Sequence, residues 1–404
     1  MENTNKEMAS RPMVVQMAVN NAPKIQEVTH GNYIKYGEAN NYPQLLIDLL
    51  NSSALHNSII NSRKDLVVGD EVVILNTEPV ERSKTEQFIE SVNPKETLHE
   101  VIDKLTYDYE TFGGYALNVI WSKDRTKIVQ MYHIDFSTIR SGVADMHGEI
   151  HEYFYSPDWS KCRYKNNKPV SIPAFNKDDR SQPSQLIYHK GYRPGQWYYP
   201  SPSYVAALNW IELDGEISNF HLSNIKNGMV PGMWVNFNNG EPQNAEQRKA
   251  IYKAIQDDFQ GSSSAGKFVI TFSDDANKAP TFQPMGVSDA DKLFITLQDL
   301  VLQNVLSAHQ LTSPMIAGIK TAGSLGGRTE LIEAFELYSN MVVKPDRRFV
   351  LDPINKILEL NNLSSIDLQN TTPISFTFTE SILQNILTEE ELREMIGKEA
   401  KEAE

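Results

Sequence analysis

The first candidate for a chemical site is a glycine-rich segment, TSPMIAGIKTAGSLGGRT (residues 312–329). It resembles a phosphate-binding loop, but that motif needs a lysine directly after its final glycine. Ser324 stands there instead, and Lys320 lies inside the segment rather than at its end. Four glycines give this backbone great conformational freedom. We therefore favour a flexible loop over a nucleotide site.

A second candidate is a histidine pair, His147 and His151, four residues apart. The acids around it are Asp145, Glu149 and Glu152. Both histidines would share a face of a strand and could bind a divalent metal there. Gly142 and Gly148 are more typical of a solvated hairpin. We favour the hairpin and predict neither metal nor cofactor.

No constellation for catalysis is found. Ser324 lacks the G-x-S-x-G surround of a hydrolase nucleophile, and no histidine and aspartate partners can be assigned to it. The paired acids 257–258 and 274–275 lie at an expected helix end and a turn, where solvation explains them. The sequence therefore predicts a protein that is not an enzyme.

The aromatic run HKGYRPGQWYYPSPSY (residues 189–204) offers flat rings with polar edges. Such a run could stack sugars or bases, which would fit a monomeric carbohydrate-binding protein or an enzyme using residues 188–204. The favoured alternative is subunit packing, because the run leads into a long helix that needs neighbours. The aromatic residues expected in that packing are Trp197, Tyr204, Trp210 and Phe220.

Composition limits the function classes. The chain has 404 residues, a net charge of −14 and one cysteine. Tight electrostatic binding to nucleic acid is disfavoured, because Lys and Arg supply most non-specific affinity for phosphates. A single cysteine gives no intramolecular disulfide and indicates a cytosolic setting. No leader and no membrane-spanning run is expected.

The elements that position these residues indicate an α+β fold. An extended arm is expected over residues 1–40, followed by a helix after Asn41 that stops at Gly69. EVVIL reads as a strand, residues 97–112 as a helix, and residues 156–184 as a long loop. The remaining strands are expected in YALNVIW, KIVQMYHI, IHEYFYSP and QLIYHKGY.

Two long helices then enclose a small insert. Helices are expected over 201–228 and 288–310, the first about 27 residues or roughly 40 Å long. The insert, 229–287, reads as strands in PGMWVNF, KFVITF and TFQPM with a helix from Ala245 to Gln260. A third helix should run from Arg328 to Val343 and end at Pro345. A late strand, ISFTF, and an acidic terminal helix should follow it.

This order resembles the tailed-bacteriophage portal proteins of the lambdoid and siphovirus type. The resemblance runs from about Phe112 to Leu360. It rests on FGGYALNVIW before KIVQMYHIDFSTI, QLIYHKGY before YYPSPSYVAALNWI, VITFSDDANKAPTFQPMGVSDADKLF, and LTSPMIAG before ELIEAFELYSNMVVKPDRRFVLDPINKIL. Each pattern is weak alone, and the ordered set is more specific.

The resemblance implies a division of the chain into the parts of a portal subunit. These parts are an arm (1–40), a wing (41–200), a first stem helix (201–228), a clip (229–287), a second stem helix (288–312), a tunnel loop (313–327), a long helix with a return to the wing (328–380) and a short crown (381–404). Residues expected in the DNA channel are Lys320, Thr321, Ser324 and Arg328. Residues expected where partners dock on the clip, or in the clip's own small core, are Trp234, Phe237 and Tyr252.

The resemblance also implies partners. Portals form rings of about twelve copies at one capsid vertex, pass double-stranded DNA during packaging and ejection, and contact the terminase large subunit, head–tail adaptors and the major capsid protein. The expected location is the virion, and the host cytoplasm during assembly. The net charge suits transient, non-specific contact with DNA, because a strongly basic bore would hold the duplex. Another phage neck ring protein is the nearer alternative.

Overall fold

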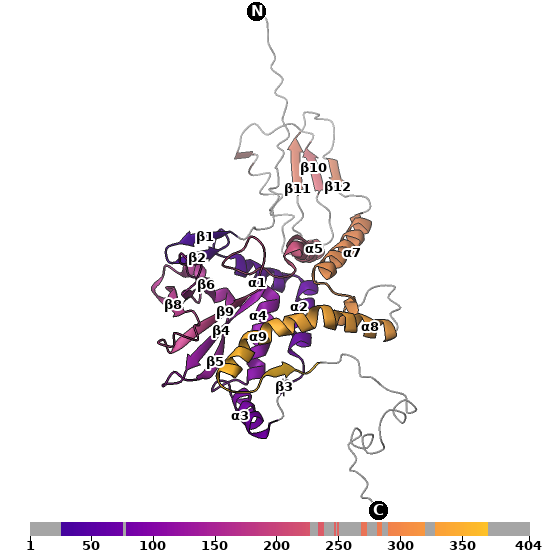
Figure 1. Ribbon diagram of the computed structural model, residues 1–404. Helices are drawn as coiled ribbons and strands as arrows, with labels where there is room; N and C mark the ends of the chain where they lie inside the picture. Colours follow the sequence, from indigo (N-terminus) through magenta and orange to yellow (C-terminus); the bar gives the residue numbers. More distant parts are fainter. Residues whose placement is uncertain are drawn as a thin grey trace, which may run out of the picture. The chain divides into compact units, whose positions relative to one another are not determined.

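The computed structural model describes residues 26–75, 78–226, 233–237, 246–247, 249, 268–272, 281–284, 290–319 and 328–370. The chain divides into two compact units. The first unit comprises residues 1–60 and 107–309, and the second comprises residues 61–106 and 310–404. Figure 1 labels most of the helices and strands of both units.

The first unit is built on an antiparallel three-stranded sheet. Its strands are β4 (Gly114–Trp121), β5 (Ile128–Ile134) and β9 (Ser184–Lys190), in the order β5-β4-β9. The central strand is buried along nearly its whole length, which explains why GYALNVIW is apolar on both faces. Helix α4 (Leu98–Phe112) leads into this strand, and Gly113 makes the turn with φ of +83°. The helix predicted over residues 97–112 is confirmed.

A second three-stranded sheet contains β6 (Ile139–Ser141), β7 (Glu152–Tyr155) and β8 (Val170–Pro173). The prediction of one long loop over residues 156–184 is wrong in part, because β8 lies within it and pairs with β7. Two 3-10 turns, Trp159–Lys161 and Lys165–Asn167, also lie there. The segment is polar because β8 is an edge strand whose first residues are exposed.

A hairpin precedes these sheets and corrects the extended arm expected over residues 1–40. Strands β1 (Glu27–His30) and β2 (Tyr33–Tyr36) pair antiparallel. Tyr36 is fully buried, stacks on Tyr199 at 3.9 Å between ring centroids, and donates its hydroxyl to Pro200 O at 2.7 Å. Contacts more than 160 residues away in sequence therefore order this hairpin. Residues 1–25 lie outside the described part of the chain.

The buried side chain of Arg140 in β6 is hydrogen-bonded to Asn40, which follows β2 in the chain. Arg140 Nε donates to Asn40 Oδ1 at 2.6 Å, and its Nη2 donates to Asn40 O at 2.9 Å. Its Nη1 donates to two carbonyl oxygens, of Ser137 and Ile139, both at 2.8 Å. The guanidinium also lies over the Trp159 ring at 4.9 Å. These bonds and the aromatic contact offset the cost of burying the cation.

The structure has two helices, α1 (Tyr42–Ser52) and α2 (Ala54–Val68), where the sequence predicts one helix after Asn41. Ser53 separates them and caps α2, because its Oγ accepts the amide of His56 at 3.1 Å. Gly69 ends α2 with φ of +67°, as the sequence predicts.

The second unit contains α3 (Pro79–Glu90), β3 (Val72–Ile74), β13 (Ile366–Leu368), α8 (Arg328–Tyr338) and α9 (Lys344–Leu360). The strand expected in EVVIL is confirmed, whereas α3 was not predicted. β13 pairs antiparallel with β3. The strand expected in ISFTF and the terminal helix lie outside the described residues.

The prediction that Pro345 ends the third helix is wrong. A π-helical turn, Ser339–Val343, joins α8 to α9, and the three form one continuous rod in Figure 1. Pro345 directly follows the π turn, in which the Lys344 N–H donates to Ser339 O five residues back, and this wider turn lets the helix continue past a residue that has no N–H. Val342 and Val343 of the π turn pack with Leu66 and Val67 in one buried cluster.

Charged groups fix α9 in the second unit. Arg63 and Asp346 form a buried ion pair at 2.8 Å. Arg347 donates to the carbonyl oxygens of Leu66, Val67 and Leu368 at 2.8–3.1 Å. It therefore binds carbonyl groups at the end of α2 that have no partner inside the helix.

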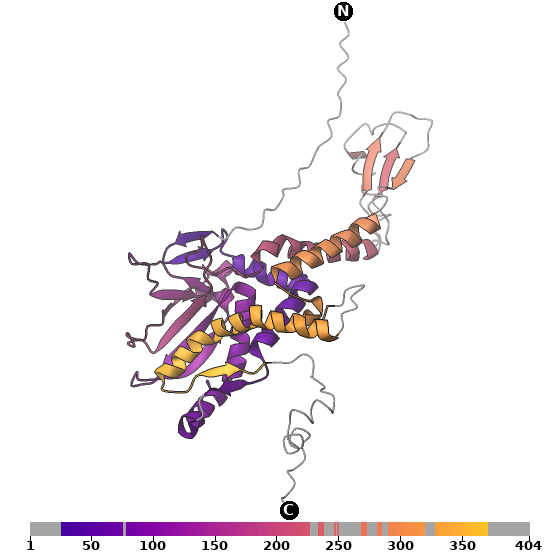
Figure 2. The same cartoon turned by 45° about the vertical axis from the view of Figure 1, so that its right-hand side comes forward.

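A small sheet stands between α5 and α7 in the sequence. Its strands are β10 (Met233–Phe237), β11 (Phe268–Phe272) and β12 (Thr281–Pro284), in the order β11-β10-β12, with β10 and β11 parallel (Figure 2). The three predicted strands are confirmed. The helix expected over residues 245–260 lies outside the described residues except for residues 246, 247 and 249, which are helical.

Candidate functional site: an exposed helix pair

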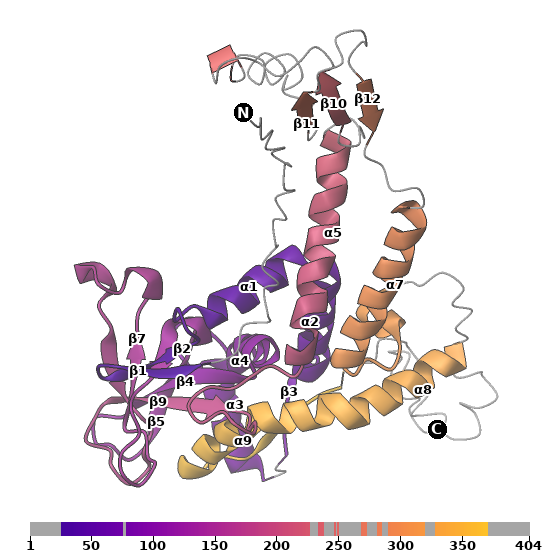
Figure 3. The same cartoon turned by 90° about the horizontal axis from the view of Figure 1, so that it is seen from above.

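Two helices of the first unit, α5 (Leu208–Lys226) and α7 (Ala290–Ala308), lie side by side and run in opposite directions (Figure 3). Each has 19 residues, or about 28 Å at 1.5 Å per residue. α5 begins seven residues after the predicted start at Ser201, and α7 ends two residues before the predicted end at Gln310. Residues 227–232 and 285–289 lie outside the described chain.

The first helix starts later than its sequence indicates. The helix expected over 201–228 would begin at Ser201 and Pro202, because serine is a common cap and proline a common first helical residue. Instead α5 begins at Leu208 after a 3-10 turn, Val205–Ala207. Tertiary contacts hold the preceding segment: Pro202 O accepts Arg193 Nη1 at 3.0 Å, and a Cβ on Gly113 would lie 2.5 Å from Ser201 O. Packing therefore overrides the local capping signal.

Helix α1 supports α5 through a close approach at Gly215. A Cβ on Gly215 would lie 3.2 Å from both Cβ and Oγ of Ser52, so a side chain here would crowd the two helices. Next to it, Ser53 Oγ donates to Asp214 Oδ2 at 2.7 Å. The N-terminal half of α5 is thus held on one side by α1.

The outer faces of the pair expose apolar side chains. Those with 45–61% of their surface exposed are Phe220, Leu222, Ile295 and Leu300. Exposed acids share these helices, namely Glu212, Glu216 and Asp299. Two helices can bury only the faces that they turn to each other and to α1, so the apolar side chains on the other faces stay in water.

The four aromatic residues predicted for subunit packing have different environments. Phe220 is exposed on α5, and Trp210 is half-buried there. Trp197 is 59% exposed and lies against Gly148, where an added Cβ would be 3.2 Å from the Trp197 Cζ2 atom. The structure corrects the prediction for Tyr204, which is fully buried inside its own chain and contacts His56 and His309.

The aromatic run 189–204 does not present a continuous flat face. Tyr199 is buried against Tyr36, and the adjoining Tyr188 stacks on Phe136 and Tyr153 at 4.9 and 4.7 Å. Burial raises the pKa of Tyr153 to about 12. Within the run itself Tyr199 and Tyr204 are buried, whereas Tyr192 and Trp197 are exposed, so only part of the run is available for stacking sugars.

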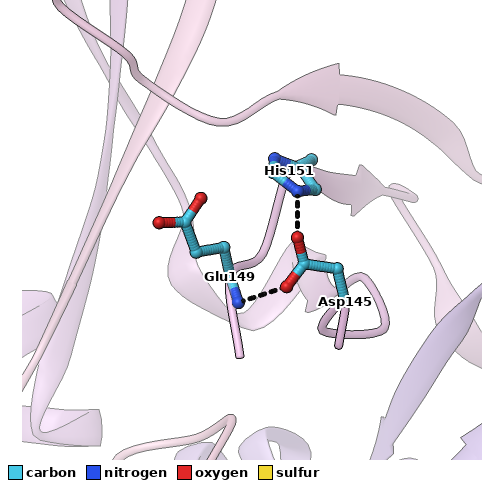
Figure 4. Close-up of side chains that lie close together, drawn as sticks. All are labelled: Asp145, Glu149 and His151. Atoms are coloured by element: carbon cyan, nitrogen blue, oxygen red, sulfur yellow. Dashed lines mark hydrogen bonds and ion pairs between the residues drawn. The ribbon is translucent and has the colours of Figure 1, made fainter. Parts of the chain in front are cut away.

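The turn around His147 brings together a different trio from the predicted pair. Asp145, Glu149 and His151 place ligand atoms within 4.8 Å of one another (Figure 4). Asp145 accepts the amides of Glu149 and His147 at 2.9 and 2.8 Å and His151 Nε2 at 2.8 Å. The amide of Glu149, followed by His151, lowers the pKa of Asp145. Hydrogen bonding within an exposed hairpin turn explains this trio without an ion.

Several predicted site residues lie where the structure gives no side-chain geometry. Lys320, Thr321, Ser324 and Tyr252 are outside the described residues. Arg328 is the first residue of α8, and Trp234 and Phe237 lie in β10, but only their backbone is described. Their roles remain predictions.

Sequence reasoning missed two residues at the base of the helix pair, which is the end where α5 begins and α7 ends. His56 and His309 are fully buried and in contact, although 253 residues separate them. No spacing in the chain signals such a pair, because only the fold brings α2 and the end of α7 together. Among the described helices, none is both long and apolar enough to cross a membrane.

Comparison with solved structures identifies the fold. The chain is similar to "Neck of empty GTA particle computed with C6 symmetry", with a TM-score of 0.53, 14% identity, and coverage of 89% of this chain and 95% of that chain. It is also similar to "Neck of native GTA particle computed with C12 symmetry", with a TM-score of 0.51, 14% identity and the same coverage. At this identity the likeness shows a common fold and nothing more.

Sequence comparison extends this likeness. The chain is 25% identical over 190 residues to the "Probable portal protein" of Haemophilus phage HP1 (strain HP1c1). The match covers 46% of this chain and 53% of that protein, so the chain spans about half the length of this relative. The family model described as phage portal protein matches residues 69–338. The chain belongs to the phage portal protein family, a family of structural proteins, which confirms the expected family and the α+β class.

Proposed function

We propose that copies of this chain assemble into a closed ring of about twelve, which serves as the conduit for double-stranded DNA during packaging and ejection. Family membership supports this proposal, as do the similar neck structures computed with C6 and C12 symmetry. The observation that carries it is the exposed apolar surface of α5 and α7.

That surface fits a neighbouring copy. Phe220 and Leu222 lie on α5, while Ile295 and Leu300 lie on α7, so one copy has apolar groups on both helices. A ring needs heterologous contacts, in which one surface of a subunit packs on a different surface of the next. Burying such a side chain fully is worth about 1.5–3 kcal/mol, enough for a set of them to stabilise a subunit interface.

The charge of the exposed helices suits a conduit. Glu212, Glu216 and Asp299 are exposed on the pair, and α8 exposes Glu330, Glu333 and Glu336. Acidic walls repel phosphates and allow a duplex to slide, whereas many Lys and Arg contacts would hold it. Contacts with DNA are then non-specific and transient, with Lys320, Thr321, Ser324 and Arg328 steadying the duplex.

The parts of the chain take the roles that the resemblance implies. Residues 41–200 form the wing, 201–228 and 288–312 the stem, 229–287 the clip, 313–327 the tunnel loop and 381–404 the crown. The clip docks the terminase large subunit and the head–tail adaptor through Trp234, Phe237 and Tyr252, and the outer rim meets the major capsid protein. The ring has no catalytic residues, and it resides in the virion and in the host cytoplasm during assembly.

The ring is tested by measuring the mass of the purified full chain across a range of concentrations, with negatively stained electron micrographs of the same sample. Closed rings of about twelve copies are expected. A monomer that persists at every concentration would contradict the proposal.

The channel loop is tested by deleting residues 320–326. The deletion should leave ring assembly intact and impair DNA packaging or retention, because the glycine-rich segment would no longer reach the duplex. A glycine-serine segment of equal length is the matched control that separates loop length from the side chains. Normal yield of DNA-filled virions from the deletion would remove the loop from the mechanism.

A further inference from the structure

Two buried histidines meet at the base of the helix pair. His56 Nδ1 lies 3.0 Å from His309 Nε2, and both residues are fully buried. His56 belongs to the first turn of α2, and His309 follows the last residue of α7. At this distance one nitrogen donates an N–H to the other, so a single proton lies between two neutral rings.

A tyrosine extends this contact to the other helix of the pair. The Tyr204 ring lies 4.4 Å from His56 and 5.0 Å from His309, measured between centroids. Its hydroxyl donates to Thr111 O in α4 at 2.7 Å. Tyr204 precedes the 3-10 turn that leads into α5. The three rings therefore tie the start of α5 and the end of α7 to α2 and α4.

The surroundings of His56 favour its neutral form. Burial lowers the pKa of His56 from 6.5 to about 3. Titratable groups on the neighbouring elements include His309, Tyr204, the half-buried Asp214 of α5 and the buried Glu110 of α4. Asp214 reaches His56 only through Ser53 Oγ, which donates to the carboxylate and accepts the His56 amide.

We propose that the His56–His309 contact is a proton-sensitive latch, which holds the base of the α5–α7 pair in its packed form and opens when an imidazole takes up a second proton. Such a proton would place a positive charge in a fully buried site, and water solvates that charge only if the rings separate. The latch is a property of one chain, so it stands independently of the proposed ring.

The direction of the pH effect follows from the buried site. A histidine whose pKa is lowered in the packed form stabilises that form fully above pH 6.5, and the stabilisation is lost as the pH falls from 6.5 towards 3. Freeing one imidazole to its ordinary pKa shifts the opening equilibrium about 30-fold between pH 7.5 and pH 5. Acid is therefore the signal that releases the base of the pair.

The test is hydrogen–deuterium exchange of the full chain at pH 7.5 and pH 5, corrected for the intrinsic pH dependence of exchange. Amides in residues 54–60 and 301–309 should exchange about 30-fold faster at pH 5 after correction. The double variant His56→Asn, His309→Gln places amide groups near Nδ1 and Nε2, so it keeps a hydrogen bond but cannot take up a proton. Its exchange in these segments should be insensitive to pH.

The outcomes separate a latch from general acid sensitivity. His147→Gln, at an exposed histidine of the first unit, is the control and should respond to acid as the natural sequence does. An equal acid response in the double variant, or none in the natural sequence, would overturn the proposal. Should the double variant misfold, an NMR titration of the natural sequence decides: a His56 that titrates near 6.5 without change in its neighbours would also overturn it.

Discussion

The first unit has a sheet region, made of its β-sheets and the β1–β2 hairpin, and a helix pair, α5 and α7. These two regions use their apolar side chains in opposite ways. In the sheet region, aromatic rings pair inside the chain, with Tyr36 on Tyr199 at 3.9 Å and Phe136 on Tyr188 at 4.9 Å. In the helix pair, Phe220 and Ile295 are 45% and 61% exposed. The comparison teaches that the sheet region supplies its own core, while the helix pair leaves part of its apolar surface for another molecule.

The largest loss of stability is expected from Arg140→Ala in the sheet region. The change takes a donor from the backbone carbonyl oxygens of Asn40, Ser137 and Ile139, whereas Asn40 Oδ1 keeps the amide of Tyr36. The free energy of unfolding should fall by about 4 kcal/mol, as for other losses of buried hydrogen-bond networks. Chemical denaturation monitored by circular dichroism measures this.

Lys123→Ala is the control for Arg140, since Lys123 is an exposed base in the same unit. Its effect should stay within about 0.5 kcal/mol. If the two variants were equally stable, the sheet region would not depend on its buried network, and the contrast with the helix pair would fail.

A smaller loss is expected where the sheet region meets the segment before α5. Gly113→Ala places a side chain at φ of +83° and 2.5 Å from Ser201 O, which should cost about 3 kcal/mol. Gly195→Ala is the matched control, because its φ is +80° but nothing lies within 4 Å of the new Cβ. The control should lose only about 1 kcal/mol from backbone conformation. Equal thermal shifts for both would refute the close approach.

The smallest effect on stability, with the largest on assembly, is expected from Phe220→Glu. The side chain is already 45% exposed, so unfolding of the single chain should change by about 0.5 kcal/mol or less. Subunit association should weaken at least about tenfold, because a charge would enter an apolar interface. Ser218→Glu adds the same charge at an exposed position of α5 and controls for repulsion alone. Mass photometry that finds both variants assembled like the natural chain would exclude Phe220 from the interface.

Local patterns predicted many elements well. Apolar spacing located α4, and alternating or apolar runs located the strands β4, β5, β7 and β9. Patterns failed where a long-range contact outweighed a local signal. The helix predicted to end at Pro345 continues through a π turn into α9, and the helix predicted to begin at Ser201 and Pro202 begins only at Leu208. The hairpin at residues 27–36 was also missed, since its order comes from Tyr199 and Pro200.

The candidate site, the α5–α7 helix pair, was also predictable only in part. Two long helices around a small insert were readable from hydrophobic period and glycine stops, and the ordered motifs pointed to the family that the family model confirms. Which side chains on those helices face water was not readable, because α1 packs on α5 at Gly215 and only the fold reveals that approach.

The sequence by itself determined the class, the order of the elements and an acidic surface, because period, turn residues and net charge are properties of neighbouring residues and of composition. Only the tertiary structure decided that Tyr204 is internal, that Phe220 is exposed, and that His56 meets His309. Burial and contact depend on residues that are distant in the chain, and a local pattern carries no information about which of them will meet.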